Sequence, residues 1–417
     1  MRNGQKMVIT QCRVCGNHEL LPVLDLGEQA LTCVFPKSPD EKVPAVPLEL
    51  VKCSPAGCGL LQLRHTPDLG LMYGDGYGYR PGIRPFMVNH LRGKAVAAAE
   101  LTNLQAGDVV VDIGSNDGTL LHQYPVEGLR LVGIDPSGEK FREHYPPAEL
   151  IADFFTAEAF TARYGKQRAK VVTTTGMFYD LPDPLRFMQD IHTILDEDGV
   201  WMTEQSYMPS MLEANAYDVV CHEHLEYYGF QQIEWMAAKV GFTVLRAEVT
   251  DVYGGSLYVT LAKNPDRHPR DEASLVALRE REAAAALDTM APYEAFARRV
   301  RQQRDDLRGF LDDSRAAGLL TCGYGASTKG NVTLQYCGIT AADLPCIGEV
   351  SEEKAGRFTP GSNIPIVSEE EAKAFRPDQL LVLPWIHREG FVEREQAYLR
   401  GGGKLVFPMP ALTAVTA

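Results

Sequence analysis

One short segment constrains the fold of this chain more than any other: an apolar strand that runs directly into a glycine-containing turn. Residues 108–113 read Asp-Val-Val-Val-Asp-Ile, and the turn from Gly114 to Gly118 follows at once. Leu120 and Leu121 then open a predicted helix. This order of strand, glycine turn and helix is typical of a nucleotide-binding βα unit.

Acidic residues close the next two predicted strands. Asp135 follows the apolar segment 129–134, and Asp153 with Phe154 follows residues 149–152. A carboxylate after the second strand can accept hydrogen bonds from both hydroxyls of a ribose. An acid and an aromatic ring after the third strand can bind and flank an adenine. We therefore predict a nucleoside cofactor bound by Asp112, Gly114, Ser115, Asn116, Gly118, Asp135, Asp153 and Phe154.

The turn sequence distinguishes between cofactors. A dinucleotide favours Gly-x-Gly-x-x-Gly, because the second glycine lets the pyrophosphate approach the backbone. This turn instead places Ser115, Asn116 and Asp117 between its two glycines. Such side chains, one of them anionic, suit the methionine part and the ribose of S-adenosylmethionine. We predict S-adenosylmethionine, with NAD or FAD as the alternative.

Further segments complete a sheet. Apolar stretches at 169–175 and 198–204 flank a predicted helix at 185–195, and residues 242–249 and 255–262 form a predicted hairpin. Alternating βα units closed by a hairpin are typical of the α/β class, as in the doubly wound, Rossmann-like sheet of class I methyltransferases. Residues 71–270 are expected to form this domain.

Two short cysteine pairs precede that domain, Cys12 with Cys15 and Cys53 with Cys58. Four thiolates at tetrahedral geometry suit Zn²⁺ and leave no open position for water. We predict a structural zinc that holds together a small module at residues 1–70. Buried thiols without metal are the alternative.

Residues 221–228 concentrate titratable groups: two imidazoles, His222 and His224, with Glu223 between them and two tyrosines after them. A histidine can accept a proton near neutral pH, and neighbouring donors can stabilise an oxyanion. Core histidines are the alternative for both, more so for His222. A catalytic metal would need a third ligand that the sequence does not identify.

The C-terminal third, residues 271–417, begins with predicted helices and then repeats the strand, glycine turn and helix at 318–331. Short apolar strands follow at 344–350, 379–383 and 404–407. This predicts a second, Rossmann-like domain. Backbone amides at its glycine turn, with the charge of Lys329, can bind an anion such as a pyrophosphate. The alternative is a domain that only forms one wall of a cleft.

Charge and composition exclude other classes of function. The 417 residues carry a formal charge of −14, which argues against a general nucleic-acid binder because phosphate contacts need clustered Lys and Arg. The first residues lack the apolar stretch of a signal peptide, and the apolar runs are only strand-sized. We expect a cytoplasmic protein with no membrane, nucleic-acid or obligate protein partner.

Taken in order, these motifs resemble one family along essentially the whole chain: the sugar-nucleotide C-methyltransferases that make branched-chain deoxysugars. The resemblance rests on the four cysteines and on the segments 73–80, 111–118, 222–228, 254–257 and 323–331.

This resemblance implies a reaction. A base removes the proton next to a 4-keto group of a thymidine or guanosine diphosphate sugar, and the enolate takes a methyl group from S-adenosylmethionine. It implies His224 as the base, Glu223 as a positioning group and Tyr79 as a residue that reaches the sugar. The implied substrate-binding residues are Tyr77, Arg80, Cys221, His222, Lys329 and Asn331.

Two places depart from the family pattern. Cys221 stands where the family has a tyrosine that contacts the substrate, and a thiol cannot reproduce the reach of that phenol. The loop at residues 80–86 also differs from the small and polar residues that the family has there. Two alternatives remain open: oxygen or nitrogen methylation of another small metabolite, and a non-catalytic interaction protein that carries the zinc module.

Overall fold

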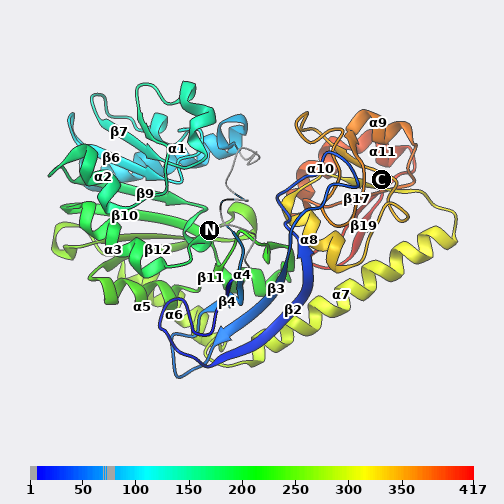
Figure 1. Cartoon of the computed structure of the whole chain (residues 1–417), viewed down its shortest axis with the longest axis horizontal. Helices are drawn as coiled ribbons and strands as arrows, with labels where there is room; N and C mark the ends of the chain where they lie inside the picture. The colour runs from blue at the N-terminus through cyan, green and yellow to red at the C-terminus, as the bar shows by residue number, and fades with distance from the viewer. Residues whose placement is uncertain (1–6, 69, 71, 73–79) are drawn as a thin grey trace.

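The structure is a computed structural model that describes residues 7–68, 70, 72 and 80–417. We divide the chain into an N-terminal module (7–68), a central domain (80–284) and a C-terminal domain (318–415). The long helix α7 (Ala291–Ala316) connects the last two and runs beside the N-terminal module (Figure 1). Among the described helices, none combines the length and the apolar composition that crossing a membrane requires.

The central domain contains a seven-stranded sheet in the order β12-β13-β10-β9-β6-β7-β8, in which only β13 runs antiparallel to its neighbours. Its strands are β6 (Val109–Ile113), β7 (Arg130–Ile134), β8 (Glu149–Ile151), β9 (Ala169–Thr175), β10 (Leu195–Ser206), β12 (Thr243–Thr250) and β13 (Ser256–Ala262). The chain order reverses between β6 and β9, where ligands bind over the carboxyl ends of strands in open α/β sheets. The predicted doubly wound sheet and its terminal hairpin are confirmed.

Helices cover both faces of this sheet. They are α1 (Pro85–Thr102), α2 (Ala157–Tyr164), α3 (Pro184–Ile194), α4 (Met208–Glu213), α5 (Phe230–Val240) and α6 (Glu272–Ala284). The side chains of β6 are all buried, as expected for an apolar parallel strand between two helical layers. Helix α6 packs against β12 and α5, so the central domain continues past residue 270.

The helix predicted after the glycine turn is absent. Only a single 3-10 turn, η3 (Leu121–Gln123), follows residues 114–118. Pro125 follows two residues after Gln123, and proline disfavours the helical conformation at the residue before it and clashes with a preceding helical turn, so a helix that begins near Leu120 ends within about one turn. Helix α1, which precedes β6 in the chain, packs against η3, β9 and β10 and covers this part of the sheet.

The N-terminal module shares a sheet with the central domain. Strand β11 (Glu226–Tyr227), from the segment that carries His224, pairs with β4 (Leu61–Leu63), and the order is β11-β4-β3-β2. β2 (Leu20–Ala30) and β3 (Ala45–Cys53) are long and reach the C-terminal domain (Figure 1). There the Ala30 amide donates to Gln335 Oε1, 2.8 Å away. The module therefore contacts both larger domains.

The C-terminal domain has a sheet in the order β16-β15-β14-β17-β18-β19, parallel except for β19. Its strands are β14 (Thr321–Tyr324), β15 (Ile347–Glu349), β16 (Ile366–Ser368), β17 (Gln379–Val382), β18 (Lys404–Phe407) and β19 (Thr413–Val415). Its helices are α8 (Thr328–Tyr336), α9 (Glu369–Ala374), α10 (Arg388–Arg394) and α11 (Gln396–Arg400). The second α/β layer predicted from the sequence is confirmed.

Candidate active site

The glycine turn after β6 has the backbone that a close ligand approach requires. Gly114 has φ +73°, and a Cβ there would lie 2.8 Å from Cγ of Met177. Asn116 also has a positive φ, and its amide donates to Asp135 Oδ2 at 2.8 Å. The turn is thus fixed to the end of β7 by the acid that the sequence assigned to the ribose.

Two of the three acids of the cofactor prediction are held at the carboxyl ends of their strands. Thr173 Oγ1 donates to Asp112 Oδ1 at 2.6 Å, and burial raises the pKa of Asp112 to about 7. Asp135 Oδ1 accepts from the Ser137 amide at 2.7 Å and from the Ser137 hydroxyl at 2.6 Å. Because each carboxylate oxygen has two lone pairs, Asp135 Oδ2 can still accept a ribose hydroxyl.

The other residues predicted to bind the cofactor differ in how well their positions suit contact with it. Asn116 Oδ1 is buried with no hydrogen-bond partner among the described residues, as expected of an atom that a ligand contacts. Ser115 Oγ lies 2.9 Å from the Tyr145 hydroxyl, so it supports the turn from behind. Asp153 is exposed and Phe154 is 50% exposed, which leaves this aromatic ring open to stack on a base.

Residues that follow the end of β9 connect His224 to this turn. The ring centroid of His224 is 4.3 Å from that of Tyr179 in η5 (Phe178–Asp180), two residues after the Met177 that packs on Gly114. The Tyr179 carbonyl also accepts the Leu225 amide at 2.8 Å. The fold therefore places the proposed base beside the cofactor turn.

The protonation state of His224 is fixed by its neighbours. Nδ1 lies 2.9 Å from the Val219 carbonyl, which can only accept, so Nδ1 carries the hydrogen and Nε2 has the free lone pair. Burial, and next Lys329, lower the pKa of His224 to about 3. The imidazole is therefore neutral at physiological pH, with an acceptor nitrogen.

The other residues of this segment point into the protein. His222 is fully buried, with Nε2 3.0 Å from the Val46 carbonyl and Nδ1 3.5 Å from Thr32 Oγ1, so neither nitrogen is left for a substrate. Thr32 Oγ1 also lies 3.5 Å from Glu223 Oε2, and burial raises the pKa of Glu223. Cys221 is 2% exposed, and burial raises the pKa of its thiol. These three side chains support the loop that carries His224.

Four cysteines of the N-terminal module form a cluster suited to zinc. The Sγ atoms of Cys12, Cys15, Cys53 and Cys58 all lie within 4.8 Å of one another. A Cβ on Gly57 would collide with the Cys53 sulfur, so glycine leaves the space that the sulfurs fill. Four thiolates and no further ligand make this a structural site, as predicted.

A narrow pocket joins the central and C-terminal domains. His224 does not line it, but His224 Nδ1 bonds the carbonyl of Val219, which does. The volume of the pocket is about 20 Å³, and the residues that line it include Asp218, Val219, Tyr253, Lys329 and Trp385. Lys329 is half-buried at the start of α8, and among the described residues its ammonium makes no ion pair. Asp218, Tyr253 and Trp385 were not predicted from the sequence, although Asp218 lies in the same segment as His224.

Other predicted substrate residues take different places. Tyr77 and Tyr79 lie outside the described residues. Arg80 contacts the cofactor turn, with Nε 3.7 Å from Asp117 Oδ2. Asn331 is buried and donates from Nδ2 to the Thr32 carbonyl at 2.8 Å, which attaches α8 to the N-terminal module.

The anion site predicted at the second glycine turn is partly filled by the chain itself. The Ala326 amide, just before α8, donates to Glu349 Oε2 at 2.7 Å. The Gly330 amide donates to the Ser327 hydroxyl at 2.9 Å. Lys329 remains the cation available to a substrate.

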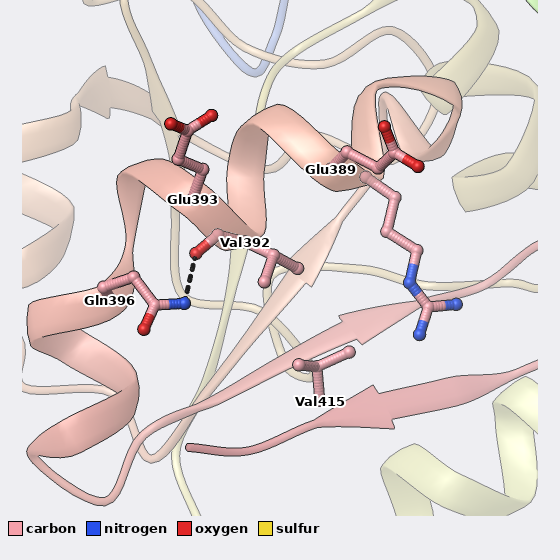
Figure 2. Close-up of a pocket in the computed structure, with 6 residues that line it drawn as sticks. Glu389, Val392, Glu393, Gln396 and Val415 are labelled. Carbon is pink, nitrogen blue, oxygen red and sulfur yellow. Dashed lines mark hydrogen bonds between the residues drawn. The ribbon is translucent and has the colours of Figure 1, made fainter.

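A larger hollow of about 520 Å³ lies elsewhere, on the C-terminal domain between α10, α11 and β19 (Figure 2). Gln396 Nε2 donates there to the Val392 carbonyl at 2.9 Å. None of the residues that carry the proposed chemistry lines this hollow. Lys329 lines the narrow pocket at the domain interface, and His224 bonds its wall through the Val219 carbonyl, so the narrow pocket is the candidate site.

Three family models match successive parts of the chain. Residues 12–73 match a zinc binding domain, residues 89–247 a methyltransferase domain, and residues 251–410 the C-methyltransferase C-terminal domain. The chain is 29% identical over 415 residues to the C-methyltransferase NovU of Streptomyces niveus, covering 98% of this chain and 97% of that protein.

Solved structures match the central domain. The mitomycin 7-O-methyltransferase MmcR matches with 18% identity and a TM-score of 0.34, covering 43% of this chain and 55% of that one. The plantazolicin methyltransferase BpumL matches with 12% identity and a TM-score of 0.34, covering 42% of this chain and 83% of that one.

The glycine turn, its acids and the matched domains define an S-adenosylmethionine-dependent methyltransferase with a structural zinc. Along nearly its whole length the chain is similar to C-methyltransferases that join a zinc binding domain, a methyltransferase domain and a C-methyltransferase C-terminal domain.

Proposed function

We propose that this C-methyltransferase acts on a nucleotide-linked 4-keto deoxysugar, and that His224 forms the enolate that accepts the methyl group. Carbon methylation requires a carbanion equivalent, so a base must remove a proton next to a carbonyl. The observation that carries the proposal is the fixed tautomer of His224, which leaves Nε2 as an acceptor beside the cofactor turn.

The balance of the step is simple. Nε2 takes the proton, the electrons of the C–H bond form the enolate, and the ketone oxygen becomes an oxyanion. S-Adenosylmethionine, when bound, supplies the methyl group. Lys329 lines the interface pocket together with Val219, whose carbonyl holds His224, and offers a positive charge to the developing oxyanion.

The pKa of about 3 describes His224 without substrate. A nucleotide sugar brings a negatively charged diphosphate, and the enolate adds another negative charge. Both favour the imidazolium and raise the pKa of His224 when substrate is bound. The proposed base is therefore neutral before the reaction and becomes more basic in the complex.

The test uses thymidine diphosphate 4-keto-6-deoxyglucose in D₂O, with methyl transfer and exchange of the alpha proton followed by NMR. In the His224→Asn variant we expect both rates to fall by at least about 10²-fold, because general-base catalysis contributes that much. The affinity for S-adenosylhomocysteine should change less than about threefold. His122→Asn, an exposed histidine outside the site, is the matched control. Exchange and transfer that persist in His224→Asn would exclude this base.

A further inference from the structure

One carboxylate oxygen of Asp218 is buried and accepts no hydrogen bond from the described residues. Its side chain is 2% exposed, in η6 (Tyr217–Val219), and Trp385 Nε1 donates to Oδ2 at 2.8 Å. The other oxygen, Oδ1, is buried and has no hydrogen-bond partner among the described residues. An unpaired acceptor in a protein interior is unfavourable and points to a ligand that completes it.

The position of Asp218 connects it to the base. Asp218 lines the narrow interface pocket, and the carbonyl of the next residue, Val219, accepts the hydrogen of His224 Nδ1. Trp385 comes from the C-terminal domain, so its hydrogen bond fixes the carboxylate from the opposite wall. One segment thus carries an acceptor, Asp218 Oδ1, and the proposed base, His224, and the Val219 carbonyl connects the two.

The pocket also contains a donor. Lys329 lines it from the C-terminal domain, with its ammonium 6.0 Å from the ring centroid of Tyr253. Burial raises the pKa of Asp218 and the charge of Lys329 opposes that rise, so the two groups interact through space. They form no direct ion pair in the described part of the chain, and each can still contact a different group of one ligand.

We propose that Asp218 binds a ring hydroxyl of the sugar, with Oδ1 as the acceptor and Trp385 as the group that orients it. This inference rests on the proposed function, because it names the contact that holds the 4-keto sugar while His224 removes the proton. Lys329 then faces the ketone oxygen. Asp218 is a specificity-determining residue, since a substrate without that hydroxyl leaves its carboxylate unpaired.

The present pocket is too small for a sugar ring. Its volume of about 20 Å³ admits roughly one water molecule. Binding therefore requires the wall formed by Trp385 and Ile386 to move away from Tyr253. The hydrogen bond from Trp385 to Asp218 forms again when the domains close on the substrate.

The experiment compares wild type with Asp218→Asn, which keeps the size of the side chain and an acceptor for Trp385 but turns an amide donor into the pocket. With thymidine diphosphate 4-keto-6-deoxyglucose we expect KM to rise about 10- to 100-fold, because a hydrogen bond to a charged acceptor is lost. kcat should change less than about threefold. Asp190→Asn, a buried aspartate paired with Arg186 on α3, is the matched control and should keep the wild-type KM.

Deoxy analogues give a second measurement that needs no variant to fold. The 2-deoxy and 3-deoxy forms of the same 4-keto sugar nucleotide each lack one ring hydroxyl. For one of the two analogues, the KM of wild type should rise by the same factor as the KM of Asp218→Asn rises with the full substrate. With that analogue the KM of Asp218→Asn should rise little further. Equal KM values for wild type and Asp218→Asn would overturn the role of Asp218. The same holds if each analogue raises the KM of the variant by the same factor as it raises the KM of wild type.

Failure of the proposed function gives a different result. If wild type transfers no methyl group to any 4-keto sugar nucleotide, the substrate class itself is wrong. If wild type is active and only the Asp218 comparison fails, the substrate class stands and this contact does not. Binding of S-adenosylhomocysteine, measured by calorimetry on each variant, shows that the cofactor site is intact.

Discussion

Arg13 Nε lies 3.6 Å from Glu226 Oε1, and both side chains are almost completely buried. Arg13 stands between the zinc-ligating Cys12 and Cys15, and Glu226 comes two residues after His224. The guanidinium also donates to the Leu63 carbonyl at 2.5 Å. The zinc site and the segment of the proposed base are therefore joined by one ion pair, across the pairing of β4 with β11.

Replacing Arg13 by methionine tests this connection. The variant leaves the Glu226 carboxyl buried without its counter-charge, which typically costs about 3–5 kcal/mol. We expect a lower free energy of unfolding in urea and a lower kcat, because β11 carries the His224 loop. Zinc content, measured by atomic absorption, should stay at the wild-type level, since the four thiols are unchanged.

Two further variants show whether the loss of stability comes from the ion pair between Arg13 and Glu226. Arg13→Met combined with Glu226→Leu removes both charges and should regain most of the lost stability. Arg64→Met breaks an exposed pair with Glu49 in the same module and should cost no more than about 1 kcal/mol. If the double variant is no more stable than Arg13→Met alone, the two residues are not coupled.

A substitution at Gly114 should reduce cofactor binding. In Gly114→Ala the residue must keep a φ near +73°, which costs about 1–2 kcal/mol for an L-residue, and its Cβ displaces Met177. Met177 leads directly into η5 and Tyr179. We expect at least a tenfold loss of affinity for S-adenosylhomocysteine in isothermal titration calorimetry.

Gly107 is the matched control for that variant. It has φ +94°, but a Cβ there would meet nothing within 4 Å. Gly107→Ala should lose a similar amount of stability through backbone strain and bind S-adenosylhomocysteine like wild type. Equal affinities for the two variants would show that the contact with Met177 does not shape the cofactor site.

Local spacing predicts much of this protein. The four zinc-ligating cysteines and the turn with Gly114 and Asp135 are recognisable because short chain segments bring their residues together. The helix predicted after Gly118 is wrong, because Pro125 ends it within about one turn and the apolar residues before it form a 3-10 turn instead.

Contacts between segments that are distant in the sequence cannot be predicted from local spacing. Nothing local marks Glu226 as the partner of Arg13, or Trp385 as the donor to Asp218, because each pair is made by tertiary packing. His222 illustrates the reverse case. Its sequence context equals that of His224, yet the turn at residues 222–223 buries one imidazole against Val46 and leaves the other half-buried beside Tyr179.

Asp112 should make the stability of the folded chain depend on pH. Burial raises its pKa to about 7, against an ordinary value near 4 in the unfolded chain. Between these values the folded state holds a proton that the unfolded state has released. Stability contributed by this group is therefore complete below about pH 4, falls as pH rises, and levels off above pH 7.

Asp112→Asn removes that dependence, because an amide does not titrate and can still accept from Thr173. We expect the free energy of unfolding of wild type to fall relative to the variant by a few kcal/mol between pH 4 and pH 7, as measured in urea without cofactor. Asp108→Asn, on the exposed start of the same segment, is the control and should follow wild type. A pH-independent difference between Asp112→Asn and wild type would mean that Asp112 is ionised in the folded protein, held as an anion by Thr173 and the nearby turn.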